Sequence, residues 1–272
     1  MPVFLSKIEI QAFGVKEGTN MTRIIMNGCN GAMGQTITRI VAEDAEAVIV
    51  AGIDPVDNKK NEYPVFKNLE ECNVEADVVI DFSAAAAVDT LLEHAIAKKL
   101  PVVLCTTGLS ENQLEKVKEA SKQIPILKSA NMSLGINMLL KLVQEAAKVL
   151  TEADFDVEIV EKHHNKKVDA PSGTALALAD SINEAMSNQY DYVYDRSQVR
   201  QRRDKKELGI SAVRGGTIVG EHEIIFAGMD EVIEFKHTAY SKAVFAKGSV
   251  SAAKFLAGRR PGFYDMSDVI RF

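Results

Sequence analysis

The sequence contains no tryptophan and only three cysteines, Cys29, Cys72 and Cys105, which lie far apart and form no Cys-x-x-Cys pair. Such cysteines predict neither a disulfide framework nor a zinc ribbon, and they fit the reducing cytosol. No apolar run approaches the roughly 18 residues that indicate a membrane span. The first ten residues lack the basic leader and apolar stretch of a secretory signal. We therefore expect a cytoplasmic protein that does not contact a membrane.

Positive charge is also scarce, because 32 Lys and Arg face 38 Asp and Glu, for a net charge of −6. General nucleic-acid binders carry the opposite sign, so no nucleic-acid partner is expected. The basic run from Arg200 to Lys206 contains Asp204 and no interleaved aromatic residue, which favours a solvated loop. With 46% hydrophobic residues, the 272-residue chain can still bury a sizeable core.

Strand-like and helical patterns alternate in the first half of the chain. Strands are predicted at 23–26, 47–53, 77–82, 101–104 and 125–127, and helices at 31–42, 84–98, 111–122 and 136–150. Strands that alternate with helices imply βαβ units and a parallel sheet. Later strands at 155–160, 210–213, 223–226 and 231–237, with a helix beginning at Ser172, predict a second unit of another kind.

The predicted fold class is therefore α/β: a Rossmann-type parallel sheet domain plus a second α+β domain with a mixed sheet. We assign residues 21–133 and 243–272 to the dinucleotide-binding domain, and 134–242 to a domain for substrate binding and oligomerisation. A last helix at about 242–257 could by its pattern close either domain. Residues 1–20 do not fit the βαβ pattern and are interpreted as an extension. Hinges are expected near 131–135 and 240–243.

A glycine-rich segment joins the first predicted strand to the first predicted helix, with glycines at 28, 31 and 34. Glycines in this context let a pyrophosphate approach backbone N–H groups at a helix N-terminus. Asn30 stands where the common pattern has its second glycine, a mild departure because asparagine tolerates left-handed backbone. Asp54 ends the second strand 20 residues after Gly34, as a ribose-binding acid should. The predicted dinucleotide site comprises Gly28, Cys29, Asn30, Gly31, Ala32, Met33, Gly34 and Asp54.

A second constellation lies at 161–175, EKHHNKKVDAPSGTA, where three lysines and two histidines occur within seven residues. The segment turns through Pro171 into Ser172, Gly173 and Thr174, a predicted helix start that could hold a carboxylate. The lysines add charge, and a histidine can donate a proton near neutral pH. These parts suit a small, multiply anionic substrate that must be protonated. The alternative is a solvated loop before a capped helix.

The pattern E-x-H-H-x-x-K-x-D-A-P-S-G-T-A closely resembles the signature of the dihydrodipicolinate reductases, enzymes of the diaminopimelate route to lysine. The resemblance covers residues 21–272 and includes the glycine loop, CTTG at 105–108, SANM at 129–132, RGG at 214–216 and VGEH at 219–222. It implies reduction of a cyclic imine dicarboxylate to tetrahydrodipicolinate by NADH or NADPH, in a homotetramer assembled through the second domain's sheet.

The resemblance also implies roles for particular residues. His163 matches the general acid of the family, and Lys167 matches the lysine that assists proton transfer and charge stabilisation. Substrate-binding positions are His164, Ser172, Gly173 and Thr174. Positions on the nicotinamide side are Cys105, Thr106, Thr107, Ser129, Ala130, Asn131 and Met132.

Two departures from the family pattern bear on the cofactor: Cys105 stands where glycine is commoner, and Ala84 stands where an arginine often lies near the cofactor. Cys105 is interpreted as a packing residue, since no His–Cys arrangement is evident. Asp54 would repel the 2′-phosphate of NADPH, so NADH is the expected preference. Lys59 and Lys60 could reach that phosphate, which keeps NADPH possible.

No cluster has metal-ligand spacing, so no metal is expected. His94 and His237 are interpreted as packing or surface residues, and the pattern assigns no role to His222. Two other functions stay open on the residues themselves. One is another two-domain dehydrogenase of amino-acid synthesis, which would need a thiolate or a different lysine–carboxylate set. The other is a non-catalytic nicotinamide-sensing module, which would not need His163 and Lys167.

Overall fold

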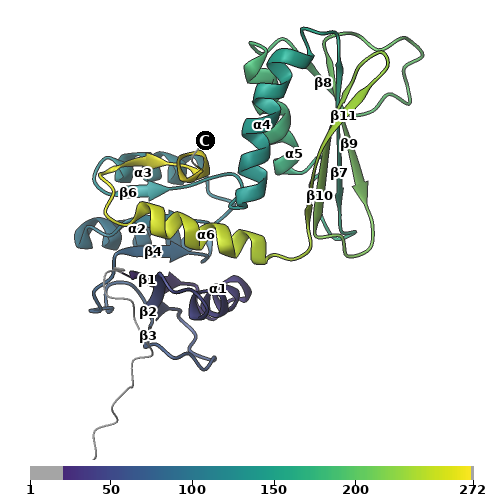
Figure 1. The fold of residues 1–272 in the computed structure, drawn as a ribbon. Coiled ribbons are helices and arrows are strands. Elements are labelled where there is room, and N and C mark those ends of the chain that lie inside the picture. The colour runs from purple at the N-terminus through teal and green to yellow at the C-terminus, as the bar shows by residue number, and fades with distance from the viewer. Residues whose placement is uncertain (1–20, 271–272) are drawn as a thin grey trace, which may run out of the picture.

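The computed structural model describes residues 21–270 and divides them into two lobes, each built on its own sheet (Figure 1). The predicted extension at 1–20 lies outside the described residues. The predicted fold class is confirmed, because a parallel sheet flanked by helices is joined to a mixed sheet covered by helices.

The first lobe contains a seven-stranded sheet in the order β12-β6-β5-β4-β1-β2-β3, with every neighbouring pair parallel. The strand order reverses beside β1, and ligands of such sheets bind in the crevice at that switch point. The strands are β1 (Thr22–Asn27), β2 (Ala47–Ile53), β3 (Val65–Phe66), β4 (Val78–Asp81), β5 (Val102–Leu104), β6 (Pro125–Leu127) and β12 (Gly262–Tyr264).

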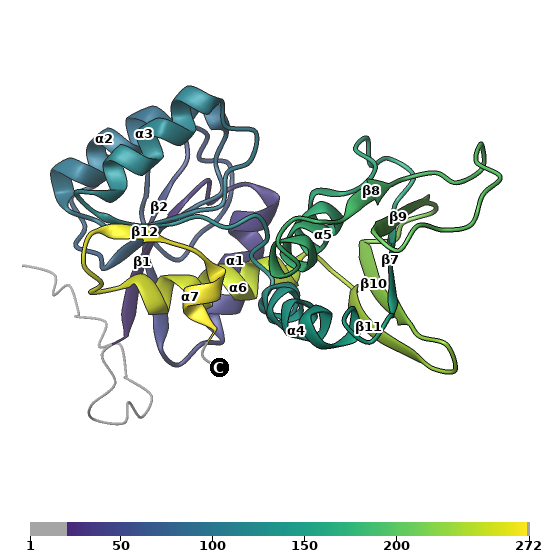
Figure 2. The same ribbon diagram turned by 90° about the horizontal axis from the view of Figure 1, so that it is seen from above.

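Helices cover both faces of this sheet, as Figure 2 shows from above. Side chains of β1 alternate between two cores: Ile24 and Met26 pack toward α1, α6 and α7, whereas Ile25 packs toward α2 and α3. This double burial explains why the strands read as nearly continuous apolar runs. The helices are α1 (Ala32–Ala42), α2 (Val88–Lys98, after the 3₁₀ turn η1, Ala85–Ala87), α3 (Glu111–Ser121), α6 (Ala243–Leu256) and α7 (Met266–Val269).

The second lobe contains a five-stranded sheet in the order β11-β10-β7-β9-β8, in which β7, β9 and β8 pair in parallel and β10 pairs antiparallel with both β7 and β11. Two helices, α4 (Leu134–Leu150) and α5 (Gly173–Ala185), cover one face, and within residues 21–270 the other face carries no helix (Figures 1 and 2). The strands are β7 (Asp156–His163), β8 (Asp191–Val193), β9 (Glu207–Arg214), β10 (Gly220–Ala227) and β11 (Val232–Ala239).

The chain passes between the lobes twice, after β6 and after β11. The second passage returns the chain to the first lobe, where α6 packs on α1 and β12 extends the sheet beside β6. The short strands β3, β8 and β12 were not anticipated from the sequence. Each has two or three residues and lies toward a sheet edge, so pairing with a longer neighbour defines it rather than any periodicity of its own.

The interpretation of 200–206 as a solvated loop is wrong for Arg203. Its side chain is only 17% exposed and forms ion pairs with Asp156 at 2.9 Å and Glu158 at 3.0 Å. It also donates to the carbonyls of Val157 and Glu207. Arg203 therefore anchors the loop to the helix-free face of the second sheet, a structural use of positive charge that the sequence pattern does not reveal.

Candidate active site

The glycine loop has the close packing that a dinucleotide cradle requires. Gly28 follows β1 with φ of +80°, and a Cβ added there would lie 2.6 Å from the carbonyl oxygen of Phe82. A Cβ on Gly34 would lie 2.3 Å from the carbonyl oxygen of Gly28, so only glycine lets α1 approach the loop this closely. Gly31 is the N-cap of α1 and makes no side-chain capping bond. The first N–H groups of α1 are thus left for an anion.

The structure corrects the interpretation of Asn30. Among the described residues of the loop, only Gly28 has a left-handed backbone. The Asn30 side chain instead donates to the carbonyl of Val56 at 2.6 Å and accepts from Asn61 at 2.9 Å. The Asn30 N–H donates to Asp54 Oδ2 at 3.1 Å. Asn30 therefore fixes the segment after β2 against the glycine loop, and Asp54 contacts that loop directly.

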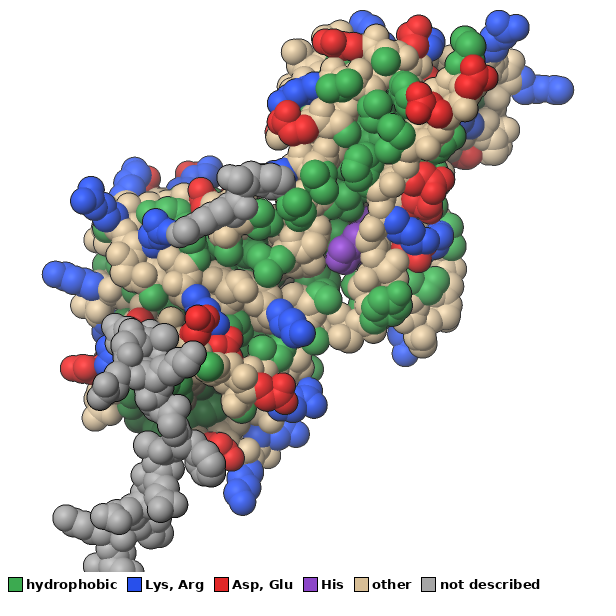
Figure 3. All heavy atoms as spheres, viewed as in Figure 1, with side chains coloured by type: hydrophobic (Ala, Val, Ile, Leu, Met, Phe, Trp, Pro, Cys, Tyr) green, Lys and Arg blue, Asp and Glu red, His purple; other side chains and the backbone are tan. Residues whose placement is uncertain are grey.

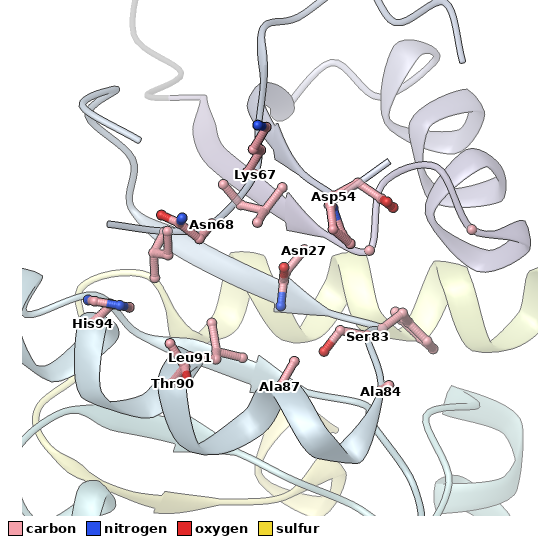
Figure 4. A pocket seen from close by; sticks show the side chains of 16 residues that line it. Asn27, Asp54, Lys67, Asn68, Ser83, Ala84, Ala87, Thr90, Leu91 and His94 are labelled. Carbon is pink, nitrogen blue, oxygen red and sulfur yellow. The ribbon is translucent and has the colours of Figure 1, made fainter. Parts of the chain in front are cut away.

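A cavity of about 520 Å³ opens between the ends of β1, β2 and β4, at the switch point of the sheet (Figure 4). Gly28, Gly31 and Asp54 line it together with Ala84. Lys59 and Lys60 are exposed and do not line this cavity. Sequence reasoning missed the remaining polar lining, which is Asn27, Lys67, Asn68, Ser83, Thr90 and His94.

A buried polar network closes the carboxyl ends of β1, β4 and β5. Asp81 is fully buried and accepts from Asn27 Nδ2 at 2.7 Å and from Thr106 Oγ1 at 2.6 Å. Burial raises the pKa of this carboxyl above its usual range. The Thr106 hydroxyl also donates to the carbonyl of Ser83 at 3.2 Å, so its side chain is engaged in the network. Thr107, by contrast, is exposed.

Neither loop cysteine has the surroundings of a nucleophile. Cys29 is fully buried, and burial together with the charge of Asp54 raises the pKa of its thiol to about 11. Burial and Asp81 raise the pKa of Cys105 well above its usual range, and Cys105 packs against the first core. A thiolate is disfavoured in both positions. Cys29 can therefore face a cofactor only through its backbone.

The segment 129–132 leads from β6 into α4, and its side chains differ in exposure. Met132 is buried in the first core, Ser129 is half-buried and Ala130 is exposed. Asn131 accepts from the N–H of Ser133 at 2.8 Å and donates to Thr174 Oγ1 at 3.0 Å. The structure thus joins a predicted nicotinamide-side residue to a predicted substrate-side residue.

His163, the predicted general acid, is the last residue of β7, and its side chain lies on the face of the sheet that α4 and α5 cover. In β7 the side chains of Val157, Ile159, Glu161 and His163 are all buried and alternate with half-buried ones. His163 is 8% exposed, and its Nδ1 lies 2.6 Å from Glu161 Oε2. Within residues 21–270, His163 Nε2 makes no hydrogen bond. Figure 3 shows a histidine side chain, not identified by a label, at the surface where the two lobes meet.

Glu161, which the sequence analysis did not single out, is fully buried. Arg214 at the end of β9 donates to both of its oxygens, at 2.6 and 2.8 Å, and the N–H of Ser172 donates at 2.9 Å. Burial opposes ionisation, but the bonds from Arg214, His163 and Ser172 outweigh it and lower the pKa of Glu161. The signal was available in the sequence, since Glu161 and His163 continue the inward-facing alternation of the strand.

Ser172 begins α5 as its N-cap, as predicted, but its polar groups are already bonded. The hydroxyl accepts from the N–H of Ala175 at 3.2 Å and lies 3.1 Å from His222 Nε2. His222 is 4% exposed, and burial lowers its pKa to about 4. His237 is the cross-strand neighbour of His222, and the Nδ1 atoms of both rings are buried without a partner in the described chain. Ser172 and His222 thus belong to the supporting structure of the site.

The other residues of the second constellation lie beside the start of α5. Lys167 Nζ forms an ion pair with Asp169 Oδ1 at 2.8 Å, and the Lys167 side chain is 22% exposed. His164 and Thr174 are half-buried. Gly173 is exposed, and a Cβ added there would meet nothing within 4 Å. The first turn of α5 therefore presents open space and two N–H groups, of Gly173 and Thr174, that the Ser172 cap does not reach.

In the part of the chain that the structure describes, no three His, Cys, Asp or Glu side chains gather in a way that could hold a metal ion. No helix between residues 21 and 270 is long and apolar enough to cross a membrane.

A Rossmann-type sheet with a glycine cradle, joined to a lobe that carries a buried histidine–carboxylate pair, defines a two-lobed nucleotide-dependent oxidoreductase. The family model for the N-terminal part of dihydrodipicolinate reductase matches residues 22–132, and the model for the C-terminal part matches residues 135–270. The chain belongs to the dihydrodipicolinate reductase family.

Individual relatives agree with this membership. The 4-hydroxy-tetrahydrodipicolinate reductase of Caldanaerobacter subterraneus subsp. tengcongensis is 53% identical over 255 residues, which cover 92% of this chain and 99% of the relative. The enzyme of the same name from Clostridium novyi is 49% identical over 251 residues, with the same coverage of 92% and 99%.

The fold also matches solved structures. The dipicolinate-bound dihydrodipicolinate reductase from Paenisporosarcina sp. TG-14 aligns with a TM-score of 0.77 at 24% identity, over 92% of this chain and 100% of that one. A probable dehydrogenase from Thermotoga maritima aligns with a TM-score of 0.59 at 14% identity, over 91% of this chain and 92% of its own. At these identities the likeness concerns the fold alone.

Proposed function

We propose that this chain reduces 4-hydroxy-tetrahydrodipicolinate to tetrahydrodipicolinate, with NADH or NADPH as reductant, in the diaminopimelate route to lysine. The observation that carries the proposal is the hydrogen bond between His163 Nδ1 and the buried carboxylate of Glu161, beside the open first turn of α5. A histidine that can donate a proton, together with free helix N–H groups and a lysine in the same segment, suits a dicarboxylate substrate. The reductases of this name that resemble the chain over 92% of its length support the substrate.

Residues of the first lobe would hold the dinucleotide. The glycine loop and the first turn of α1 suit its pyrophosphate, and Asp54 suits the adenosine ribose. We assign Thr107 and residues 129–132 to the nicotinamide side. When bound, the dinucleotide supplies the hydride that goes to ring C4 of the substrate.

Residues of the second lobe would bind the substrate and donate the proton. His163 donates a proton from Nε2 to the ring as it becomes more electron-rich on reduction. Lys167 assists by stabilising negative charge, and the N–H groups of Gly173 and Thr174 bind a substrate carboxylate with His164 nearby. Water is lost from the hydroxylated ring. The proposal assigns no step to a metal ion.

We expect NADH to be preferred over NADPH. The carboxylate of Asp54 lies at the cavity where the adenosine ribose would bind, and a 2′-phosphate of charge near −2 would be repelled there. Ala84 offers no cation beside the same cavity. Since reduced nicotinamide cofactors are available in the cytosol, we place the reaction there.

The proposal includes assembly into a homotetramer through the helix-free face of the second sheet. That face carries the half-exposed Val213 and Val232 together with the Lys162–Glu221 and Lys236–Glu221 ion pairs. Apolar side chains interleaved with paired charges suit contact between copies of the chain. Sedimentation velocity of the protein and of a Val213→Lys, Val232→Lys variant tests this, since the variant should sediment as a smaller species.

The catalytic proposal is tested by steady-state oxidation of NADH with enzymatically generated substrate. Substrate-dependent oxidation that pyridine-2,6-dicarboxylate inhibits competitively is the expected result. A protein that binds NADH without oxidising it in this assay would instead be a sensing module. Oxidation of NADH with aspartate semialdehyde alone, or reduction of NAD⁺ with homoserine alone, would identify a different dehydrogenase.

A further inference from the structure

We propose that Glu161, paired with Arg214, is the positioning residue of the site: it sets the tautomer and orientation of His163 and fixes the start of α5. The inference rests on the proposed function, in which His163 is the proton donor. Glu161 accepts from His163, Arg214 and the N–H of Ser172, and among the described residues it forms no hydrogen bond with Gly173 or Thr174, so it acts through His163 and Ser172 rather than on the substrate.

The tautomer follows from the bonding of the carboxylate. Two N–H groups of Arg214 and the N–H of Ser172 all donate to Glu161, which identifies an ionised carboxylate that can only accept. The ring nitrogen at 2.6 Å must then carry a proton, so Nδ1 of His163 is the protonated nitrogen. A neutral His163 therefore leaves Nε2 bare, and a cationic one carries its transferable proton there. A carboxylate that fixes the histidine tautomer in this way is a recurring device in catalytic sites.

Arg214 makes this arrangement rigid. Its guanidinium bonds both oxygens of Glu161 and also donates to the carbonyls of Asp169 and Val213. The carbonyl of Asp169 belongs to the segment that carries Lys167. One arginine thus ties β9 to the carboxylate and to the lysine-bearing segment.

Gly220 leaves the opposite side of the imidazole open. A Cβ added to Gly220 would lie 3.1 Å from His163 Nε2, tighter than ordinary contact. The ring of His222 stands edge-on to that of His163, with centroids 5.2 Å apart, and limits tilting. The bond to Glu161 therefore fixes the ring at Nδ1, and the lack of a side chain at Gly220 leaves Nε2 uncrowded.

A double-mutant cycle separates positioning from mere stability. Glu161→Gln should lower kcat about 10–100-fold, the usual effect of losing a group that orients a histidine. In a His163→Gln background the same change should lower kcat no further, because Glu161 acts through His163. Equal losses of kcat in both backgrounds would overturn the proposal.

Arg203→Lys is the matched control. Arg203 is as buried as Arg214, 17% against 19% exposed, bridges β7 and β9 as Arg214 does, and lies on the opposite face of the sheet. The Arg203→Lys variant should keep kcat within about twofold of the wild-type value. Arg214→Lys cannot form the bidentate contact with Glu161, so its kcat should fall as much as that of Glu161→Gln. Equal losses in both lysine variants would contradict a specific role for Arg214.

The tautomer of His163 can also be measured by NMR on the full-length wild-type chain, so this test does not depend on whether a Glu161 variant folds. ¹⁵N NMR of the protein with labelled histidine, with His163 assigned from the His163→Gln spectrum, should show a protonated Nδ1 and an unprotonated Nε2 in the neutral ring. A neutral His163 protonated at Nε2 would overturn the inference even in an active enzyme. A wild-type chain that shows the Nδ1–H form but no reductase activity would refute the proposed function and leave the Glu161–His163 geometry standing.

Discussion

The side-chain amide of Asn131 donates a hydrogen bond to Thr174 Oγ1 over 3.0 Å, and this bond joins the loop after β6 to the first turn of α5. A further bond from Asn137 Nδ2 holds the carbonyl of Asn131 at 2.7 Å. The loop expected beside the nicotinamide and the turn expected around a substrate carboxylate are therefore positioned by each other. Cofactor and substrate affinities should be coupled through this contact.

Removing the donor tests that coupling. Asn131→Ala removes the amide that donates to Thr174, whereas Asn131→Asp would not break the contact, because the Thr174 hydroxyl can donate to a carboxylate. We expect kcat/KM to fall by roughly tenfold, because a neutral hydrogen bond contributes about 0.5–1.5 kcal/mol. The KM values for substrate and NADH should both rise in steady-state measurements. A change in only one of them would show that the two sites are not coupled here.

His163 is expected to be the proton donor of the reaction. His163→Gln removes the acid while keeping a polar side chain at the end of β7, so kcat should fall about 10²–10⁴-fold. The change in KM should be smaller, since binding of the carboxylates is assigned to other residues. Stopped-flow or steady-state rates at saturating substrate measure this. Near-normal kcat would remove His163 from the role.

Lys167 is expected to stabilise the negative charge of the bound dicarboxylate, and the structure adds a competitor for it. The ion pair with Asp169 must be exchanged for the substrate, so Asp169→Asn should strengthen binding of pyridine-2,6-dicarboxylate severalfold. Lys167→Ala and Thr174→Val should weaken it. Isothermal titration of the three variants against wild type gives the comparison. Unchanged affinity in all three would place the anion site elsewhere.

Local patterns in the sequence predicted the elements that frame the site. The strand bounds at 47–53 and 125–127 agree with β2 and β6, and Ser172 caps the helix that was expected to begin there. These features can be predicted because each has a local sequence signal. A strand buried on both faces is a continuous apolar run, and a helix N-cap prefers residues such as serine. The glycine loop was equally readable, since only glycine permits its close contacts.

The partners that hold the site together could not be predicted in the same way. Arg214 lies 53 residues from Glu161, and Asp81 lies 54 residues from Asn27, so sheet pairing alone brings them into contact. The same holds for Lys67, which the strand β3 carries to the cavity in place of Lys59 and Lys60. Residues far apart in the chain require the register of the strands before their contacts can be known.

His222 should make the folded state sensitive to mild acid. Burial, with the positive charges of His163, His237 and Lys167, lowers its pKa from 6.5 to about 4, although Glu161 acts in the opposite direction. The unfolded chain therefore binds more protons between pH 6.5 and 4, so this contribution to stability is complete above pH 6.5 and is lost on acidification. The loss approaches about 3 kcal/mol, at 1.36 kcal/mol per pKa unit. The free energy of unfolding, measured with urea, should depend less on pH in His222→Gln than in the wild-type protein. The same pH dependence in both proteins would contradict this.

Cofactor preference depends on two charges at one cavity. Asp54 favours NADH by repelling the 2′-phosphate, while Lys67 lines the same cavity and is the cation that could offset the repulsion. A lysine in solvent is a screened point charge, weaker than a bidentate arginine, so the preference for NADH should stay below about 100-fold in kcat/KM, or roughly 2.7 kcal/mol. Asp54→Ala should reduce the ratio of kcat/KM for NADH to that for NADPH, mainly by raising kcat/KM for NADPH, and Lys67→Gln should increase this ratio.

The double variant Lys59→Gln, Lys60→Gln is the control. It should leave the ratio unchanged, because those side chains lie outside the cavity. Dissociation constants of both dinucleotides, measured by fluorescence at one ionic strength, should follow the same order. A tenfold preference of the wild-type enzyme for NADPH would contradict the argument from Asp54.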